Sequence, residues 1–136
     1  MTEVNATRGG AMRPGKILVV DDDPEVRMAT RDFLTSKGYE VAVAEGGREA
    51  LRLLALSPAD VVLLDVAMPD MDGMETLKRI ISAHPDMPVI MVTANADIEI
   101  TSKVLQMGAA DYVPKPFDLD YLDQAISIQL SAGRGN

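Results

Sequence analysis

The chain has 136 residues, 47% hydrophobic and 25% charged, a composition typical of one globular domain with a buried core rather than of a disordered segment. Its formal net charge of −8 disfavours direct binding to nucleic acid, and the absence of cysteine excludes disulfides and thiolate metal sites. No apolar run is long enough to span a membrane and the N-terminus carries no signal-peptide pattern, so we expect a cytoplasmic domain.

The first part of the chain predicts a tail, then a strand and a helix. Residues 1–15 are polar and contain glycine without hydrophobic periodicity, which indicates a flexible N-terminal tail. A strand is predicted at Lys16–Asp21. Asp23 then stands at an N-cap position with Pro24 as the first helical residue, and Gly38 is placed to end the helix.

Strand and helix patterns alternate through the rest of the chain. Strands are predicted at Glu40–Ala44, Val61–Asp65, Val89–Thr93 and Ala110–Val113. Helices are predicted at Arg48–Leu56, from Asp72 or Gly73 onward, at Asp97–Met107 and at Leu119–Leu130. The run Val61–Asp65 is apolar without alternation up to its last residue, which is typical of a central strand covered on both faces.

This alternation predicts an α/β fold of the flavodoxin-like, doubly wound (βα)5 type. Five strand–helix units imply a parallel five-stranded sheet between two layers of helices, a three-layer sandwich. Right-handed crossovers with strand order 2-1-3-4-5 would place the first and third strands side by side. We therefore predict a single domain over residues 16–131, followed by a short C-terminal tail at 132–136.

Polar side chains follow four of the five predicted strands. Asp21 and Asp22 follow the first strand, Asp65 ends the third, Thr93 ends the fourth and Lys115 follows the fifth. In a parallel sheet these strand ends open on one edge, so three carboxylates, a hydroxyl and an ammonium should converge there. Hard oxygen donors without His or Cys favour Mg²⁺ or Mn²⁺ over zinc. The set predicts a site for a divalent cation and a phosphoryl group.

Four motifs in this order resemble a known family. VVDDDP, LLDVAMPDMDG, VTA and YVPKPF look like the motifs of the CheY-like receiver domain of two-component response regulators, and the resemblance covers roughly residues 16–130. It implies that Asp65 accepts a phosphoryl group from a histidine kinase or a phosphotransfer protein. It also implies that Asp22 and Asp65 bind Mg²⁺ directly, that the backbone carbonyl of Ala67 is a third ligand, and that Asp21 acts mainly through water.

The same resemblance assigns roles to three other residues. Thr93 would donate its hydroxyl to a phosphoryl oxygen, Lys115 would neutralise the charge of the transferred group, and Tyr112 matches the switch aromatic that responds to Thr93. Such a domain is a signalling phosphoacceptor that catalyses only its own phosphorylation and dephosphorylation, not an enzyme acting on other substrates.

The output surface is expected on the face formed by the helix Asp97–Met107, the last strand and the final helix. On the final helix, Tyr121 and Ile128 lie outside the apolar stripe predicted to be buried. This face is a candidate for binding a downstream effector domain or protein, or a second copy of the chain. No direct contact with nucleic acid or with a membrane is expected.

Two other classes compete with this interpretation. VVDDDP contains the Asp-x-Asp opening of haloacid-dehalogenase-like phosphohydrolases, and Thr93 and Lys115 would match later motifs of that family. Against it, Asp118 and Asp120 resemble helix-start residues rather than a further acidic pair, and LLDVAMPDMDG would stay unexplained. A flavodoxin-like cofactor binder would need a Ser/Thr/Gly-rich phosphate loop after the first strand, which is missing. The single histidine, His84, lies in a turn cluster away from these motifs.

Overall fold

Strands and helices alternate along the chain as predicted. The computed structural model describes residues 15–66, 71–93, 98–115 and 117–134. The strands are β2 (Lys16–Val20), β3 (Glu40–Ala44), β4 (Val61–Asp65), β5 (Val89–Thr93) and β6 (Asp111–Pro114). The helices are α1 (Pro24–Ser36), α2 (Gly47–Leu56), α3 (Gly73–Ala83), α4 (Ile98–Met107) and α5 (Leu119–Arg134).

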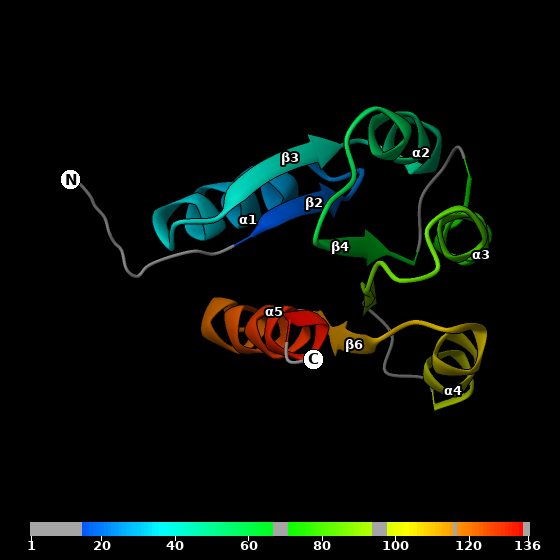
Figure 1. Cartoon of the computed structure of the whole chain (residues 1–136). Helices are drawn as coiled ribbons and strands as arrows, with labels where there is room; N and C mark the ends of the chain where they lie inside the picture. Colours follow the sequence, from blue (N-terminus) through cyan, green and yellow to red (C-terminus); the bar gives the residue numbers. More distant parts are fainter. Residues whose placement is uncertain (1–14, 67–70, 94–97, 116, 135–136) are drawn as a thin grey trace.

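The five strands form one parallel sheet in the order β3-β2-β4-β5-β6, which confirms the predicted order 2-1-3-4-5. The central strands are in close register, with Val19 opposite Leu63 and Leu64 opposite Met91. In Figure 1 the arrows of β2, β3 and β4 point the same way, with α2, α3 and α4 along the right side of the view and α1 and α5 along the left. The carboxyl ends of all the strands therefore lie on one edge of the sheet.

Each face of the sheet carries its own apolar core, because successive strand residues point to opposite faces. Leu18 and Leu64 belong to the core that α2, α3 and α4 cover. Ile17 and Leu63 belong to the core that α1 and α5 cover. All five residues of β4 are buried, which explains why Val61–Asp65 shows no polar alternation.

The predicted helix signals are confirmed at three helix starts and one helix end. The Asp23 side chain accepts a hydrogen bond from the backbone of Glu25 and Pro24 begins α1. Asp72 caps α3 and Asp118 accepts from the amide of Asp120 at the start of α5. Gly38 follows α1 with φ +98°, a backbone conformation that favours glycine.

Several boundaries differ from the prediction. The strand β2 ends at Val20, and β6 is shifted by one residue to Asp111–Pro114. The last helix continues to Arg134, beyond the predicted end at Leu130 and into the predicted tail, because Ser131 and Ala132 are compatible with a helix. Residues 1–14, most of the predicted N-terminal tail, and Asp97, the predicted first residue of α4, lie outside the described residues.

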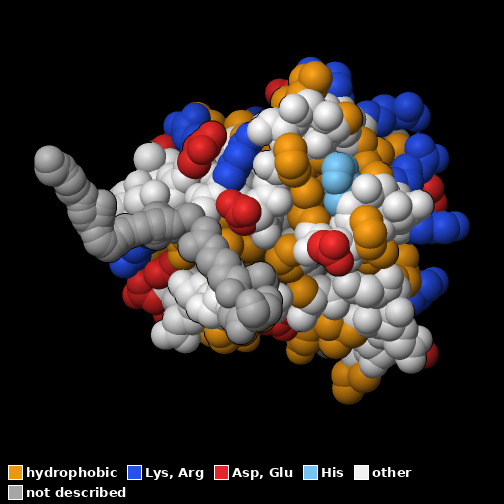
Figure 2. All heavy atoms as spheres, in the orientation of Figure 1, with side chains coloured by type: hydrophobic (Ala, Val, Ile, Leu, Met, Phe, Trp, Pro, Cys, Tyr) orange, Lys and Arg blue, Asp and Glu red, His pale blue; other side chains and the backbone are white. Residues whose placement is uncertain are grey.

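The exposed surface is not uniformly acidic. Figure 2 shows Lys and Arg side chains gathered on the right side of the molecule, the side of α2, α3 and α4 in Figure 1. Exposed basic residues on these helices are Arg48, Arg52, Lys78, Arg79 and Lys103. The net negative charge is therefore carried by the rest of the molecule, including the carboxyl edge of the sheet. In the part of the chain that the structure describes, no helix is long and apolar enough to cross a membrane.

Candidate functional site

Three carboxylates meet at the carboxyl edge of the sheet, as predicted. Asp21, Asp22 and Asp65 each offer an oxygen, and these oxygens lie within 4.8 Å of one another. The meeting follows from the topology, because β2 and β4 are neighbours and Asp65 ends β4 while the other two follow β2. Asp21 and Asp65 are buried, whereas Asp22 is exposed. Like charges this close repel one another unless a cation offsets them.

Lys115 supplies one such cation from the end of β6. Its Nζ lies 2.9 Å from Oδ2 of Asp21 and 3.2 Å from Oδ2 of Asp65. The predicted convergence of Lys115 with the carboxylates is therefore confirmed. Burial by itself would lower the pKa of Lys115, but its hydrogen bond to Asp21 and the attraction of the Asp65 and Asp21 charges outweigh burial and raise the pKa.

The contribution of Lys115 to stability is expected to be constant near neutral pH and to disappear in alkali. Because folding raises this pKa, the ammonium form favours the folded state below the ordinary value of 10.5, and the effect is lost as pH rises through the higher folded-state pKa. The difference in unfolding free energy between wild type and Lys115→Met should therefore stay level around neutrality and shrink above pH 10.5. A difference that already falls between weakly acid and weakly alkaline pH would contradict this assignment.

The donors at this edge are suited to a hard divalent cation. All three are carboxylate oxygens, which Mg²⁺ and Mn²⁺ prefer, and His84 follows α3 at the opposite edge of the sheet. The exposed Asp22 leaves one side of the cluster open to water, as Mg²⁺ requires because it retains several waters. Ala67, the predicted backbone ligand, lies outside the described residues.

The remaining predicted residues lie on the neighbouring strands. Thr93 is buried at the end of β5, one residue beyond the pairing of Asp65 with Val92. The backbone amide of Lys115 donates to the carbonyl of Thr93 at 2.6 Å, which ties the ends of β5 and β6 together. Tyr112 is half-buried on β6 and packs against the core under α2, α3 and α4. Thr93 therefore lies at the same edge as the carboxylates. Tyr112 lies two residues before the carboxyl end of β6.

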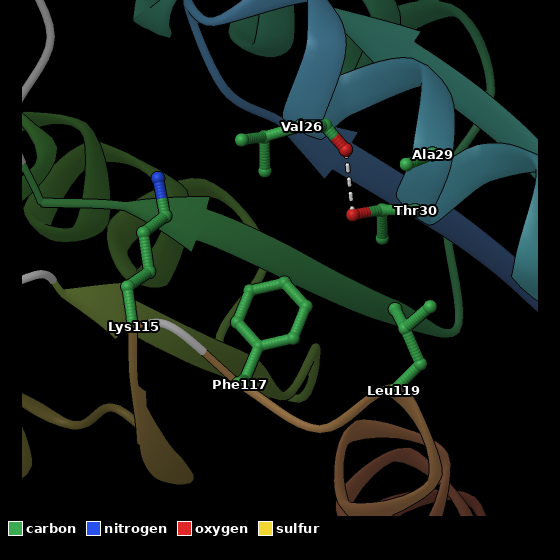
Figure 3. Close-up of a pocket in the computed structure, with 6 residues that line it drawn as sticks. All are labelled: Val26, Ala29, Thr30, Lys115, Phe117 and Leu119. Carbon is green, nitrogen blue, oxygen red and sulfur yellow. Dashed lines mark hydrogen bonds between the residues drawn. The ribbon is translucent and has the colours of Figure 1, made fainter.

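An apolar hollow that the sequence analysis did not predict opens beside Lys115. It has a volume of about 360 Å³ and is lined by Val26, Ala29, Thr30, Lys115, Phe117 and Leu119. Figure 3 shows the Phe117 ring between the α1 residues and the start of α5, with the Thr30 hydroxyl donating back to the Val26 carbonyl. Although both are apolar residues of α1, Ala29 is exposed and Val26 only half-buried. The residue in the sequence that could have indicated this hollow is Phe117, inside the YVPKPF motif.

Gly73 is expected to be essential for the backbone that carries Asp65. A Cβ at Gly73 would overlap the Asp65 carbonyl oxygen and lie 2.6 Å from Cα of Val66, and both are backbone atoms that cannot turn away. Gly73→Ala should therefore destabilise the fold by about 3 kcal/mol or more, measured by urea unfolding. A stability gain, the usual effect of Gly→Ala in a helix, would contradict the close contact.

Comparison with known proteins agrees with the fold and identifies the family. The model of the response regulator receiver domain matches residues 17–127. The chain is 42% identical over 120 residues to the DNA-binding transcriptional regulator NtrC of Klebsiella pneumoniae, covering 85% of this chain and 26% of that protein. It is 45% identical over 109 residues to the response regulator MprA of Mycolicibacterium vanbaalenii, covering 80% of this chain and 47% of that protein.

Solved receiver structures superpose along nearly their whole length. The CheY-like receiver domain protein of Methanospirillum hungatei has a TM-score of 0.86 at 32% identity, covering 90% of this chain and 98% of that one. The receiver domain of the Francisella response regulator 1452 has a TM-score of 0.83 at 32% identity, covering 88% and 98%. The chain belongs to the receiver domain family of two-component response regulators. It spans about a quarter of the length of NtrC and about half that of MprA.

Proposed function

We propose that this chain is a phosphorylation-controlled switch in which Asp65 accepts a phosphoryl group in the presence of Mg²⁺. The observation that carries the proposal is the position of the Asp65 carboxylate, which lies within 4.8 Å of two other carboxylates and 3.2 Å from the Lys115 ammonium. Asp22 and Asp65 would hold the cation directly and Asp21 mainly through water. The carbonyl of Ala67 completes this proposed set.

The residues at the edge can each serve one part of the transfer. A carboxylate oxygen of Asp65 attacks the phosphorus of the donor, the bond from phosphorus to the donor's leaving atom breaks, and an acyl phosphate forms. The bound cation would offset negative charge on the transferred group. Lys115 would turn its ammonium from Asp65 to a phosphoryl oxygen, and Thr93 would donate its hydroxyl to another.

Mass measurement after incubation with acetyl phosphate tests the proposal. With Mg²⁺ the intact chain should gain one phosphoryl group, and with EDTA the gain should fall sharply. Steady hydrolysis of p-nitrophenyl phosphate without a stable phosphoryl adduct would instead support the phosphohydrolase interpretation. Asp118 caps α5 and Asp120 lies in its first turn, so neither residue supplies the acidic pair which that alternative needs.

We infer that the donor is a histidine kinase or phosphotransfer protein that places an apolar side chain in the hollow beside Lys115. A protein donor must bring its phosphoryl group to Asp65, so its surface has to cover the adjoining edge of the sheet. The hollow opens at that edge, is almost wholly apolar and has Phe117 on its wall. Burial of an apolar side chain of the donor in this hollow would hold the donor's phosphoryl group close to Asp65.

We further infer that the output surface, which binds the downstream partner, is the face of α4, β6 and α5. Four apolar residues are exposed on its helices, Ile98 at 79%, Leu105 at 42%, Tyr121 at 49% and Ile128 at 63%. An exposed apolar group of this kind is suited to binding an effector or a second copy of the chain. Tyr112 on β6 would connect this face to Thr93, so that phosphorylation shifts the population between two surface arrangements.

Amide chemical shifts recorded with and without beryllofluoride, which mimics the phosphoryl group, test the output face. The amides of Leu105, Tyr112, Tyr121 and Ile128 are expected to shift in addition to those at the carboxyl edge. Leu56 is a matched control, because it is 74% exposed on α2, which α3 separates from α4. Shifts confined to the carboxyl edge, or larger at Leu56 than at Tyr121, would place the output elsewhere.

A further inference from the structure

The backbone of Asp21 is held by a residue that the proposed chemistry does not use. Arg27, in the first turn of α1, donates from Nη1 to the main-chain carbonyl oxygen of Asp21 at 2.8 Å. This carbonyl belongs to the peptide unit that joins Asp21 to Asp22. A guanidinium bond to it therefore fixes the direction in which the chain leaves Asp21, and with it the Cα–Cβ direction of Asp22.

The other polar atoms of Asp21 are also engaged. Its amide donates to the carbonyl of Ala44 at 3.2 Å, its Oδ1 accepts from the amide of Asp23 at 2.9 Å, and its Oδ2 accepts from Lys115 at 2.9 Å. In contrast, the exposed Asp22 side chain has no hydrogen bond or ion pair within the described residues. The position of Asp22 thus depends on the peptide unit before it, where Arg27 binds.

We propose that Arg27 is a positioning residue for divalent-cation binding, acting through the Asp21–Asp22 peptide rather than by contact with the cation. The inference rests on the proposed function, since it assumes that Asp22 helps to bind Mg²⁺. A partner that orients a metal ligand from behind typically changes metal affinity by 10–100-fold when it is removed. Positive charge near the site works in the opposite direction, because it repels a cation. Loss of Arg27 therefore weakens Mg²⁺ binding only if orientation outweighs charge.

Comparison of Arg27→Met with Arg31→Met separates these two effects. Arg31 lies one turn further along α1 and pairs with Asp32 at 2.9 Å, so its loss removes the same charge and leaves the Asp21 carbonyl bond intact. Mg²⁺ is titrated into each folded chain and followed by amide chemical shifts. We expect the Kd for Mg²⁺ to rise about tenfold in Arg27→Met and to stay level or fall in Arg31→Met.

A second readout distinguishes positioning from general damage. In Arg27→Met the Mg²⁺ concentration for half-maximal loading by acetyl phosphate should rise about tenfold, while the rate at saturating Mg²⁺ stays close to wild type. Should Arg27→Met fail to fold, Arg27→Lys can replace it, because Lys keeps the charge but lacks the planar guanidinium that reaches the Asp21 carbonyl. Arg27→Lys should bind Mg²⁺ several-fold more weakly than wild type.

Unchanged or tighter Mg²⁺ binding in the Arg27 variant, with a normal wild-type response, would overturn this inference and leave the proposed function intact. Equal weakening in the Arg27 and Arg31 variants would also overturn it. A wild-type chain that binds no Mg²⁺ would overturn the proposed function and this inference together.

Discussion

Asp65→Asn is expected to take up no phosphoryl group from acetyl phosphate under conditions in which the wild-type chain is loaded. The substitution keeps the size of the side chain but replaces the carboxylate nucleophile with a neutral amide. It also removes one of three clustered negative charges while Lys115 keeps its pair with Asp21 at 2.9 Å, so the fold itself should persist. Intact mass after incubation with Mg²⁺ gives the measurement.

Asp118→Asn is the matched control for this substitution. Asp118 is exposed just before α5, and Asn keeps the capping bond to the helix. This variant should load like the wild type. Loading of Asp65→Asn at the wild-type rate would refute Asp65 as the acceptor, and loss of loading in both variants would point to general damage.

Asp22→Ala is expected to remove most of the stabilisation that Mg²⁺ gives the folded chain. A ligand that binds only the folded state at a hundred times its dissociation constant stabilises it by about 2.7 kcal/mol. Asp22 has an oxygen within 4.8 Å of those of Asp21 and Asp65, so its loss should remove most of this effect. Without Mg²⁺ the variant should be at least as stable as the wild type, because one of three like charges has gone.

Melting temperatures with millimolar Mg²⁺ and with EDTA give the comparison. Asp23→Asn serves as control, because Asp23 is the exposed neighbour of Asp22 and Asn still caps α1. It should keep the rise in melting temperature with Mg²⁺. An equal rise in wild type and Asp22→Ala would contradict a role for Asp22 in cation binding.

The fold and most of the candidate site follow from local sequence patterns. Apolar runs of strand length that lead into Asp21, Asp65, Thr93 and Lys115 place three kinds of side chain at one edge once the strands are parallel. Helix caps at Asp23 and Asp72 could be predicted for the same reason, since capping depends on residues only a few positions apart. The strand order was predicted from the flavodoxin-like fold class together with right-handed crossovers.

Contacts between distant parts of the chain could not be predicted in this way. The Tyr39 hydroxyl donates to Asp123, 84 residues away on α5, and no local pattern pairs these two residues. Such contacts depend on rotamers and on how the helices pack, which no periodicity encodes. The hollow beside Phe117 was missed for this reason. The bond from Arg27 to the Asp21 carbonyl joins residues only six positions apart, and it was missed because it depends on the Arg27 rotamer.

Reductive trapping of the phosphorylated chain locates the acceptor most directly. Borohydride reduces an acyl phosphate to a primary alcohol, so a phosphorylated aspartate becomes homoserine while the free carboxylates of the cluster are left unchanged. After loading with acetyl phosphate and Mg²⁺, reduction and peptide mass mapping should place homoserine at Asp65 alone. Homoserine at Asp21 or Asp22, or a phosphoryl group retained on a residue outside the cluster, would contradict the proposed switch.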